Sequence, residues 1–129
     1  MSHKYILIVD DSNDFQELLT FFLESQGYEV ANVTNGRAAL EECAAELEKH
    51  QHLPDIILLD IEMPVMDGFE FLEKKKQQLH IAKTPVILMS AAVVDEEKVE
   101  KAAIKKFLKK PFELKELQNA IEKTIPFPS

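Results

Sequence analysis

Apolar residues along the chain form two alternating patterns. Five short stretches are rich in apolar and β-branched residues, as the strands of a sheet are; they are Tyr5–Val9, 28–33, Ile56–Leu59, 84–90 and 105–109. Between and after them, apolar residues recur every three or four positions, which is the spacing of one helix face. The pattern therefore predicts a strand followed by a helix, repeated five times.

Capping residues and glycines indicate where the helices begin and end. Ser12 can cap a first helix over about 13–25, which ends at Gly27, and Thr34 can cap the second. The second helix carries one apolar stripe, formed by Ala39, Leu40, Cys43, Ala44 and Leu47. The remaining helices are expected over 68–79, after the capping residue Asp95, and over 113–123.

This order of elements predicts an α/β fold with a parallel sheet. Strands that are apolar on both faces and separated by helices typically form a parallel sheet that helices cover on both sides. The length of 129 residues suits one domain, and no repeat or linker is visible. We expect a single domain over 1–129, with a core of about 4–123 and a tail of 124–129.

Composition excludes several classes of protein. The formal net charge of -8 argues against direct nucleic-acid binding. The apolar run near the N-terminus is too short for a signal peptide or a membrane span. The single cysteine, Cys43, cannot form an internal disulfide and is expected in the core. We expect a soluble, cytoplasmic protein that does not bind a membrane.

The charge is unevenly distributed along the chain. Residues 1–68 contain 14 acidic and 3 basic side chains, whereas residues 69–129 contain 9 acidic and 12 basic ones. Ordinary solvated surfaces explain this difference. This explanation is favoured over the alternative of an acidic ion-binding end with a lysine-bearing surface for partners elsewhere.

Several chemically active side chains come at or directly after the end of a predicted strand. They are Asp10, Asp11, Asp60, Ser90, Lys109 and Lys110. All strands of a parallel sheet end at the same edge, where open α/β sheets bind ligands. Three carboxylates that lie close together repel each other, and Mg²⁺ is the cation that best suits such oxygen ligands. Asp60 lies at the end of an apolar strand, beside this cation site. A carboxylate can act as a nucleophile and form an aspartyl phosphate, and the cation and a lysine can neutralise the phosphoryl oxygens.

Four motifs at these strand ends resemble the receiver domain of two-component response regulators, in form closest to the stand-alone, chemotaxis-regulator type. "ILIVDDS" resembles the family's first strand and acid pair, and "DIILLDIEMPVMDG" its phosphoacceptor strand and loop. "TPVILMSA" resembles the switch-serine strand, and "FLKKPF" the lysine–proline motif. The resemblance covers about Lys4 to Lys123. It implies a doubly wound, flavodoxin-like (βα)5 fold with strand order 2-1-3-4-5.

The resemblance also implies roles in phosphoryl transfer. Asp60 would accept the phosphoryl group from a histidine kinase or a phosphotransfer protein. Mg²⁺, with Mn²⁺ as an alternative, would be bound by Asp11 directly, by Asp10 through water, by Asp60 and by the backbone carbonyl of Glu62. Lys110 would pair with the phosphoryl group, through a cis peptide bond to Pro111. Its neighbour Lys109 would point to the other face of the strand.

A conformational switch is implied in the same way. Ser90 would hydrogen-bond a phosphoryl oxygen, and Phe107 would move inward when Ser90 moves. The change would alter the surface of the fourth helix, fifth strand and fifth helix, which would bind a protein target. The residues leave open whether Phe107 is instead a permanent core residue. They also leave open whether the chain acts on a target directly or passes phosphate onward.

Two other functions stay open at this level. A phosphatase of the haloacid-dehalogenase type also uses an aspartate nucleophile on an α/β sheet, but it has a second aspartate where Glu62 stands here. Its acid pair also comes late in the chain, whereas Asp10 and Asp11 come first. A degenerate receiver would bind partners without phosphorylation, yet no acid, lysine or hydroxyl is missing. We therefore expect a signalling domain that does not turn over an external substrate.

Overall fold

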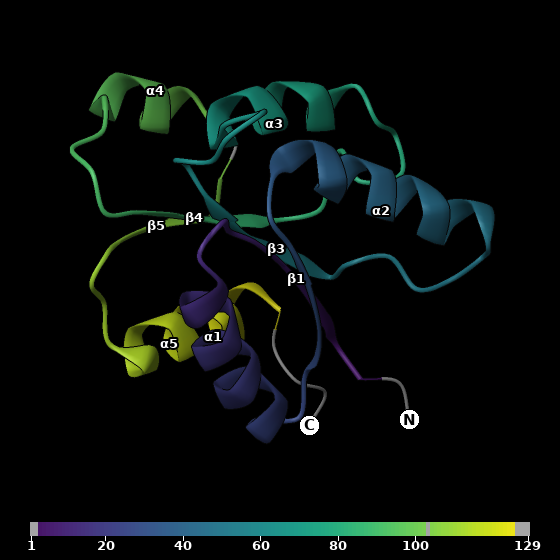
Figure 1. The fold of residues 1–129 in the computed structure, drawn as a ribbon, viewed down its shortest axis with the longest axis horizontal. Coiled ribbons are helices and arrows are strands. Elements are labelled where there is room, and N and C mark those ends of the chain that lie inside the picture. Colours follow the sequence, from purple (N-terminus) through teal and green to yellow (C-terminus); the bar gives the residue numbers. More distant parts are fainter. Residues whose placement is uncertain (1–2, 103, 126–129) are drawn as a thin grey trace.

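The computed structural model describes residues 3–102 and 104–125, which form five strand–helix units (Figure 1). The strands are β1 (Tyr5–Val9), β2 (Glu29–Val33), β3 (Ile56–Asp60), β4 (Val86–Ser90) and β5 (Lys106–Lys109). The helices are α1 (Asn13–Ser25), α2 (Gly36–Glu48), α3 (Gly68–Lys76), α4 (Glu96–Lys101) and α5 (Leu114–Thr124). The predicted alternation of strands and helices is confirmed.

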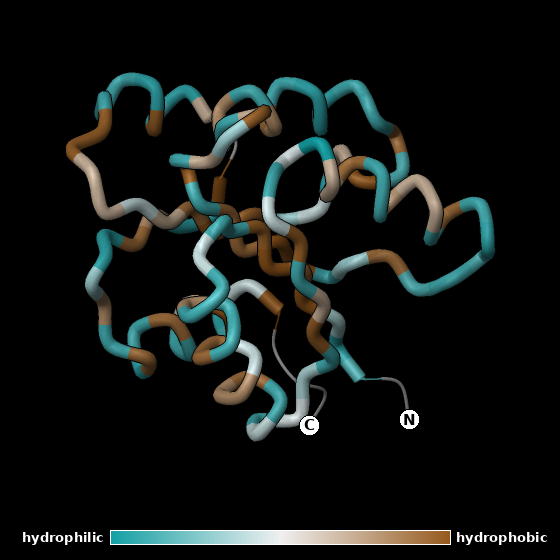
Figure 2. The backbone as a smooth tube through the Cα atoms, viewed as in Figure 1, coloured by the Kyte–Doolittle hydropathy of each residue, from teal (hydrophilic) through white to brown (hydrophobic). Residues whose placement is uncertain are grey.

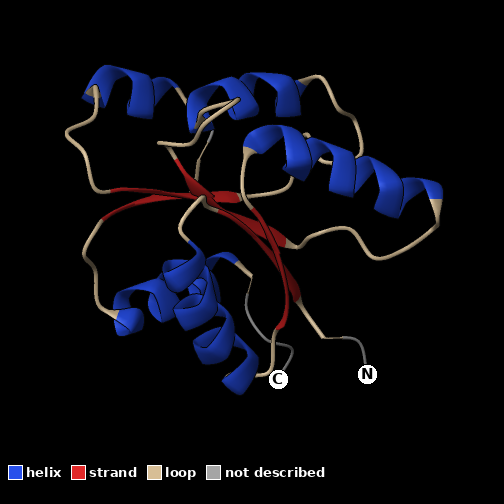
Figure 3. Ribbon diagram, in the orientation of Figure 1, coloured by secondary structure: helices blue, strands red, loops and turns tan. Residues whose placement is uncertain are grey.

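The strands form one parallel sheet in the order β2-β1-β3-β4-β5, as predicted. Helices α2, α3 and α4 cover one face of this sheet, and α1 and α5 cover the other (Figures 1 and 3). The direction of the crossover changes between β1 and β3, which is where ligands bind in sheets of this kind. The topology therefore places a crevice at the carboxyl ends of β1 and β3.

Alternate residues of the central strands supply two separate cores. Tyr5, Leu7 and Val9 of β1 pack toward α2 and α3 in one buried cluster, together with Cys43 and Phe71. The residues between them pack toward α1 and α5 in the other cluster, because successive side chains of a strand point to opposite faces. Figure 2 shows the apolar colour concentrated on these strands. The expected core position of Cys43 is confirmed.

The two outer strands are less buried than the sequence pattern suggested. Every residue of β1, β3 and β4 is buried, but no residue of β2 is, and in β5 only Leu108 is. A strand at the edge of a sheet has a neighbour on one side only, and its outer positions reach solvent. The prediction of strands buried on both faces therefore holds for the central strands alone.

Three predictions about the helices are wrong in detail. Asn35, not Thr34, caps α2, because its side chain accepts a hydrogen bond of 2.8 Å from the Ala38 amide. Helix α3 ends at Lys76, before Leu79, which is 94% exposed. On α2 the apolar stripe is displaced: Ala44 and Leu47 are exposed, and Glu46 is buried in their place.

No helix among the described residues is long and apolar enough to span a membrane.

Helix α5 continues to Thr124, one residue past its expected end. Most of the expected tail, residues 126–129, lies outside the described residues.

Candidate functional site

The register of the sheet brings the predicted strand-end residues to one edge. Val9 of β1 pairs with Leu59 of β3, so Asp10 and Asp60 follow on neighbouring strands. Asp60 pairs with Met89 of β4, and Ser90 pairs with Lys109 of β5. The sheet thereby gathers carboxylates, a hydroxyl and lysines that lie up to 100 residues apart in sequence.

Three carboxylates lie close enough to share one cation. Single oxygens of Asp10, Asp11 and Asp60 all lie within 4.8 Å of one another. Asp10 is fully buried and Asp60 nearly so, whereas Asp11 is exposed. The cluster therefore opens to solvent on the Asp11 side, and hard oxygen ligands with room for water suit Mg²⁺.

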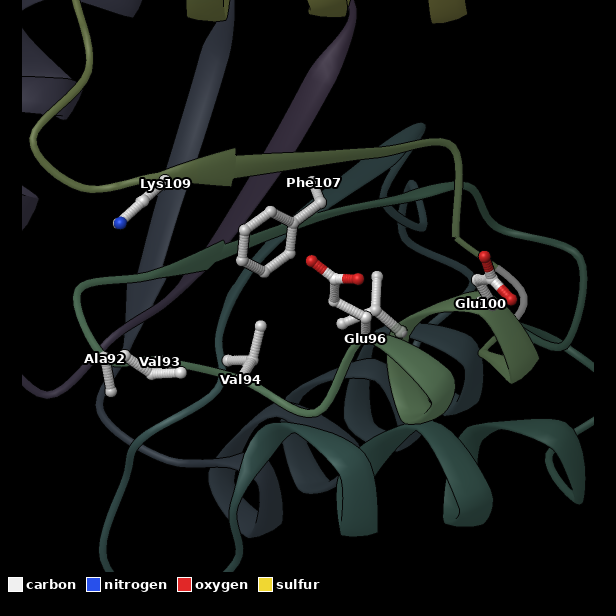
Figure 4. A pocket seen from close by; sticks show the side chains of 8 residues that line it. Ala92, Val93, Val94, Glu96, Glu100, Phe107 and Lys109 are labelled. Carbon is white, nitrogen blue, oxygen red and sulfur yellow. The ribbon is translucent and has the colours of Figure 1, made fainter.

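Lys110 balances part of this negative charge. Its Nζ lies 2.8 Å from Oδ2 of Asp10 and 3.7 Å from Oδ1 of Asp60. The same amine lies 4.2 Å from the centre of the Phe15 ring, a cation–π contact. The Lys110–Pro111 peptide bond is cis, as the resemblance implied. Lys109 lies on the other side of β5 and lines a cavity beside α4 (Figure 4).

The environment of Asp60 raises its pKa from 3.8 to about 6. Burial is the main cause, and the charge of Asp10 adds to it. Lys110 acts in the opposite direction, as does the Glu62 amide, which lies 3.4 Å from Oδ1 of Asp60. Asp60 is thus a crowded carboxylate whose negative charge is incompletely compensated by the protein. A bound cation would relieve that crowding, so the residues present fit a magnesium site.

Two residues that support the acid cluster were not identified from the sequence. The Gln16 side chain, from α1, donates 2.7 Å hydrogen bonds to the backbone oxygens of Asp10 and Val33. The signal available in the sequence was a polar residue three positions before Leu19, on the face of the helix that is otherwise apolar. Gly68 is the second of these residues. A Cβ at this position would lie 2.8 Å from Cα of Ile61 and 2.9 Å from the backbone carbonyl oxygen of Asp60. Only glycine lets α3 begin this close to the end of β3.

Ser90 and Phe107 lie on the α4 side of the sheet edge. Ser90 is fully buried, and its Oγ accepts a 3.1 Å hydrogen bond from the Ala92 amide. Phe107 is half-buried, and its ring projects from β5 toward α4 over a cavity of about 390 Å³ (Figure 4). The loop that follows Ser90 lines the same cavity through Ala92, Val93 and Val94. Movement of this loop would therefore change the space around the Phe107 ring.

The loop between β3 and α3 contains a strained residue. Val65 has a φ of 70° and is 71% exposed. A β-branched residue in this left-handed region is an outlier that costs roughly 1–2 kcal/mol. The strain lies within the loop that positions Glu62, next to the acid cluster.

Replacing Val65 by asparagine should raise the free energy of unfolding by about 1 kcal/mol, because asparagine tolerates the left-handed conformation. Urea unfolding would measure the change. Val93→Asn is the matched control: Val93 is 97% exposed but has no positive φ, so its replacement should change stability little. Equal effects at both positions would show that side-chain polarity, not backbone strain, is responsible.

Comparison with known proteins agrees with this geometry. The family model described as "Response regulator receiver domain" matches residues 6–122. The chain is 34% identical to sporulation initiation phosphotransferase F of Bacillus subtilis (strain 168), with 100% of this chain and 99% of the relative covered. It is 35% identical to chemotaxis protein CheY of the same organism, covering 97% and 99%. Regulatory protein AtoC of Escherichia coli (strain K12) is 37% identical over 96% of this chain, which spans only 26% of AtoC.

Solved structures give the same result for the fold. The receiver domain of a sensor histidine kinase from Pseudomonas aeruginosa PAO1, with magnesium coordinated in its active-site cleft, matches with a TM-score of 0.83 at 28% identity. That match covers 98% of this chain and all of the other. The chemotaxis response regulator CheY4 of Vibrio cholerae matches with a TM-score of 0.80 at 27% identity, over 96% of this chain and 100% of the other.

The alternative of a haloacid-dehalogenase-type phosphatase finds no support in these matches. Stand-alone receiver proteins are among the relatives that the chain covers almost entirely. Together with the parallel sheet of order 2-1-3-4-5, they show that the chain belongs to the response regulator receiver domain family, the phosphorelay domains of two-component signalling.

Proposed function

We propose that Asp60 of this chain is the residue that accepts a phosphoryl group, donated by a histidine kinase or a phosphotransfer protein. One observation carries the proposal: Nζ of Lys110 approaches both Asp10 and Asp60, within a cluster of three carboxylates that can share a cation. A nucleophilic carboxylate needs its incoming phosphoryl oxygens neutralised, and this arrangement provides both a fixed ammonium and a cation site.

Asp10, Asp11, Asp60 and the backbone carbonyl of Glu62 would hold Mg²⁺, or Mn²⁺. The bound cation would supply charge neutralisation at the phosphoryl oxygens. The ionised Asp60 carboxylate forms the new O–P bond while the P–N bond of the donor's phosphohistidine breaks, and the donor's imidazole leaves with the electron pair of that bond. Lys110 exchanges part of its contact with Asp10 for a contact with a phosphoryl oxygen. Gln16 keeps the backbone at Asp10 in place through its hydrogen bond to the Asp10 carbonyl oxygen.

The new charge on Asp60 would be read by Ser90. Its buried hydroxyl, whose oxygen accepts from the Ala92 amide, would donate its hydrogen to a phosphoryl oxygen, which draws Ser90 and the following loop toward the site. Phe107 then packs into the space that this loop leaves, over the cavity beside α4. The result is a shift between two forms of the surface made by α4, β5 and α5, to which a protein target binds. No turnover of an external substrate is part of this function.

Mass spectrometry after incubation with acetyl phosphate and Mg²⁺ tests the proposal. The wild-type chain should gain the mass of one phosphoryl group, and Asp60→Asn should gain none. Asp95→Asn is the matched control, since Asp95 is an exposed helix cap and asparagine caps a helix as well as aspartate does. A phosphoryl group that remains in Asp60→Asn, or is found on another residue in the wild type, would refute the assignment.

A further inference from the structure

A second pocket lies at the opposite edge of the sheet, where the strands begin. Its volume is about 380 Å³, and it lies beside α2 and the first residues of β1 and β2. A volume at the lower end of the range for ligand pockets suits a small ligand or one side chain. The polar and aromatic residues that line it are Tyr5, Glu29, Glu42, Glu46, Gln51 and His52.

Glu46 faces inward from α2, against the apolar pattern of that helix. It is 7% exposed, while the next residue, Leu47, is 47% exposed. Its Oε1 atom is fully buried and has no hydrogen-bond partner among the described residues. A buried carboxylate without a partner is costly, so a glutamate kept here in place of leucine requires an explanation. Positions that break a local pattern in this way are often functional.

Tyr5 forms the other buried wall of the pocket. It is 4% exposed, and within the described part of the chain its hydroxyl makes no hydrogen bond of normal geometry. The hydroxyl lies near the Glu46 carboxylate, and burial together with that negative charge raises the pKa of Tyr5. Burial is also the main cause of the raised pKa of Glu46. The phenol of Tyr5 and the carboxylate of Glu46 thus lie close to each other in the pocket, and each interacts with the other as its nearest polar neighbour. Neither the Tyr5 hydroxyl nor Oε1 of Glu46 has a further hydrogen-bond partner among the described residues.

The surrounding cations compensate Glu46 only in part. The nearby buried Lys75 donates its amine to the Ala82 carbonyl oxygen at 3.0 Å. His52 lowers the pKa of Glu46, but its Nε2 atom lies 3.2 Å from Oδ2 of Asp55, which it also serves. Among the described residues, no lysine or arginine forms an ion pair with Glu46. The exposed Glu29 and Glu42 add further negative charge at the mouth.

The shape and chemistry favour a planar organic cation over a metal ion. In the described residues, the acids that approach closely enough to share an ion are Asp10, Asp11 and Asp60, which lie at the other edge of the sheet. A guanidinium group presents five N–H donors in one plane and stacks on aromatic rings. The pocket is lined by carboxylate and phenol oxygens and by the rings of Tyr5 and His52, whose centroids lie 5.8 Å apart in an edge-to-face arrangement.

We propose that this pocket binds a guanidinium group, with Glu46 and Tyr5 as its buried acceptors. The group comes either from a small free guanidine or from an arginine side chain of a partner protein. Binding here does not require phosphorylation of Asp60, so the two proposals succeed or fail separately.

Amide NMR spectra recorded during titration with ethylguanidinium, and with its neutral isostere ethylurea, test the proposal. Ethylguanidinium should shift the amide signals around Tyr5 and the end of α2, with saturation, and ethylurea should not. Glu46→Gln removes one charge at constant shape, and should weaken binding about tenfold or more. Glu48→Gln is the matched control, because Glu48 is exposed on the same helix and lies outside the pocket.

Tyr5→Phe is the second variant, which removes only the hydroxyl and should weaken binding severalfold. Equal binding of ethylguanidinium by Glu46→Gln and the wild type would overturn the proposal. Equal shifts with ethylurea, or shifts spread over all acidic surfaces, would also overturn it, because they would show that the pocket does not recognise a guanidinium group specifically. A capped Gly-Arg-Gly peptide distinguishes the two sources of the guanidinium group. If the peptide binds more tightly than ethylguanidinium, the ligand is an arginine side chain of a partner protein. If the peptide binds more weakly, the ligand is a small free guanidine.

Discussion

Replacing Lys110 by methionine is expected to lower the free energy of unfolding by roughly 2–4 kcal/mol, a large effect for one lysine. The side chain of Asp10 is 0% exposed, and Lys110 approaches its Oδ2 atom at 2.8 Å. Removal of the ammonium leaves that carboxylate buried, with the Ser12 amide as its remaining described partner. Asp60 loses its neighbouring cation at the same time. Urea unfolding in the absence of divalent metal would measure the loss.

The adjacent lysine is the natural control for this experiment. Lys109 is exposed and lines the cavity on the other side of β5, so Lys109→Met should change stability by less than about 0.5 kcal/mol. Asp10→Asn combined with Lys110→Met should recover part of the loss, because the uncompensated buried charge is then gone. Equal losses at both lysines would contradict the proposed electrostatic origin.

Replacing Asp60 by asparagine should raise the stability of the metal-free protein by about 1–2 kcal/mol near pH 7.5. The pKa of Asp60 in the folded protein is about 6, above its ordinary value of 3.8. The folded state therefore binds a proton more tightly than the unfolded state does. The contribution of Asp60 to stability falls as pH rises from about 4 through about 6, and above that range the ionised carboxylate is destabilising.

Unfolding measured as a function of pH distinguishes this mechanism from a general effect of the substitution. The difference between Asp60→Asn and the wild type should be small near pH 4 and reach its full size above about pH 6. Addition of Mg²⁺ should reduce the difference, because a cation bound by the wild type compensates the same charge. A constant difference across the pH range would show that the charge of Asp60 is not the cause.

Most elements of the fold were predictable because their signals are local. The apolar runs that end at Val9, Leu59 and Ser90 are strands in the structure, and the helix caps Ser12 and Asp95 were identified correctly. The convergence of Asp10, Asp11 and Asp60 followed from one property of parallel sheets, namely that all their strands end at one edge.

Contacts between layers were not predictable in the same way. The rotation of α2 about its axis buries Glu46 and exposes Leu47, although both residues fit the spacing of an inward face. Only packing against the sheet and α3 decides which of two adjacent positions is covered. The support of Asp10 by Gln16 is likewise a contact between separate elements.

The sequence by itself determined the strand–helix order, the residues at the strand ends and the family, because these depend on neighbours along the chain and on motif spacing. The tertiary structure alone decided that Lys110 lies closer to Asp10 than to Asp60, and that the buried side chains of Tyr5 and Glu46 line one pocket. The physical reason is that side-chain distances between elements depend on how helices rotate and settle on the sheet, and this is a property of the whole packed core.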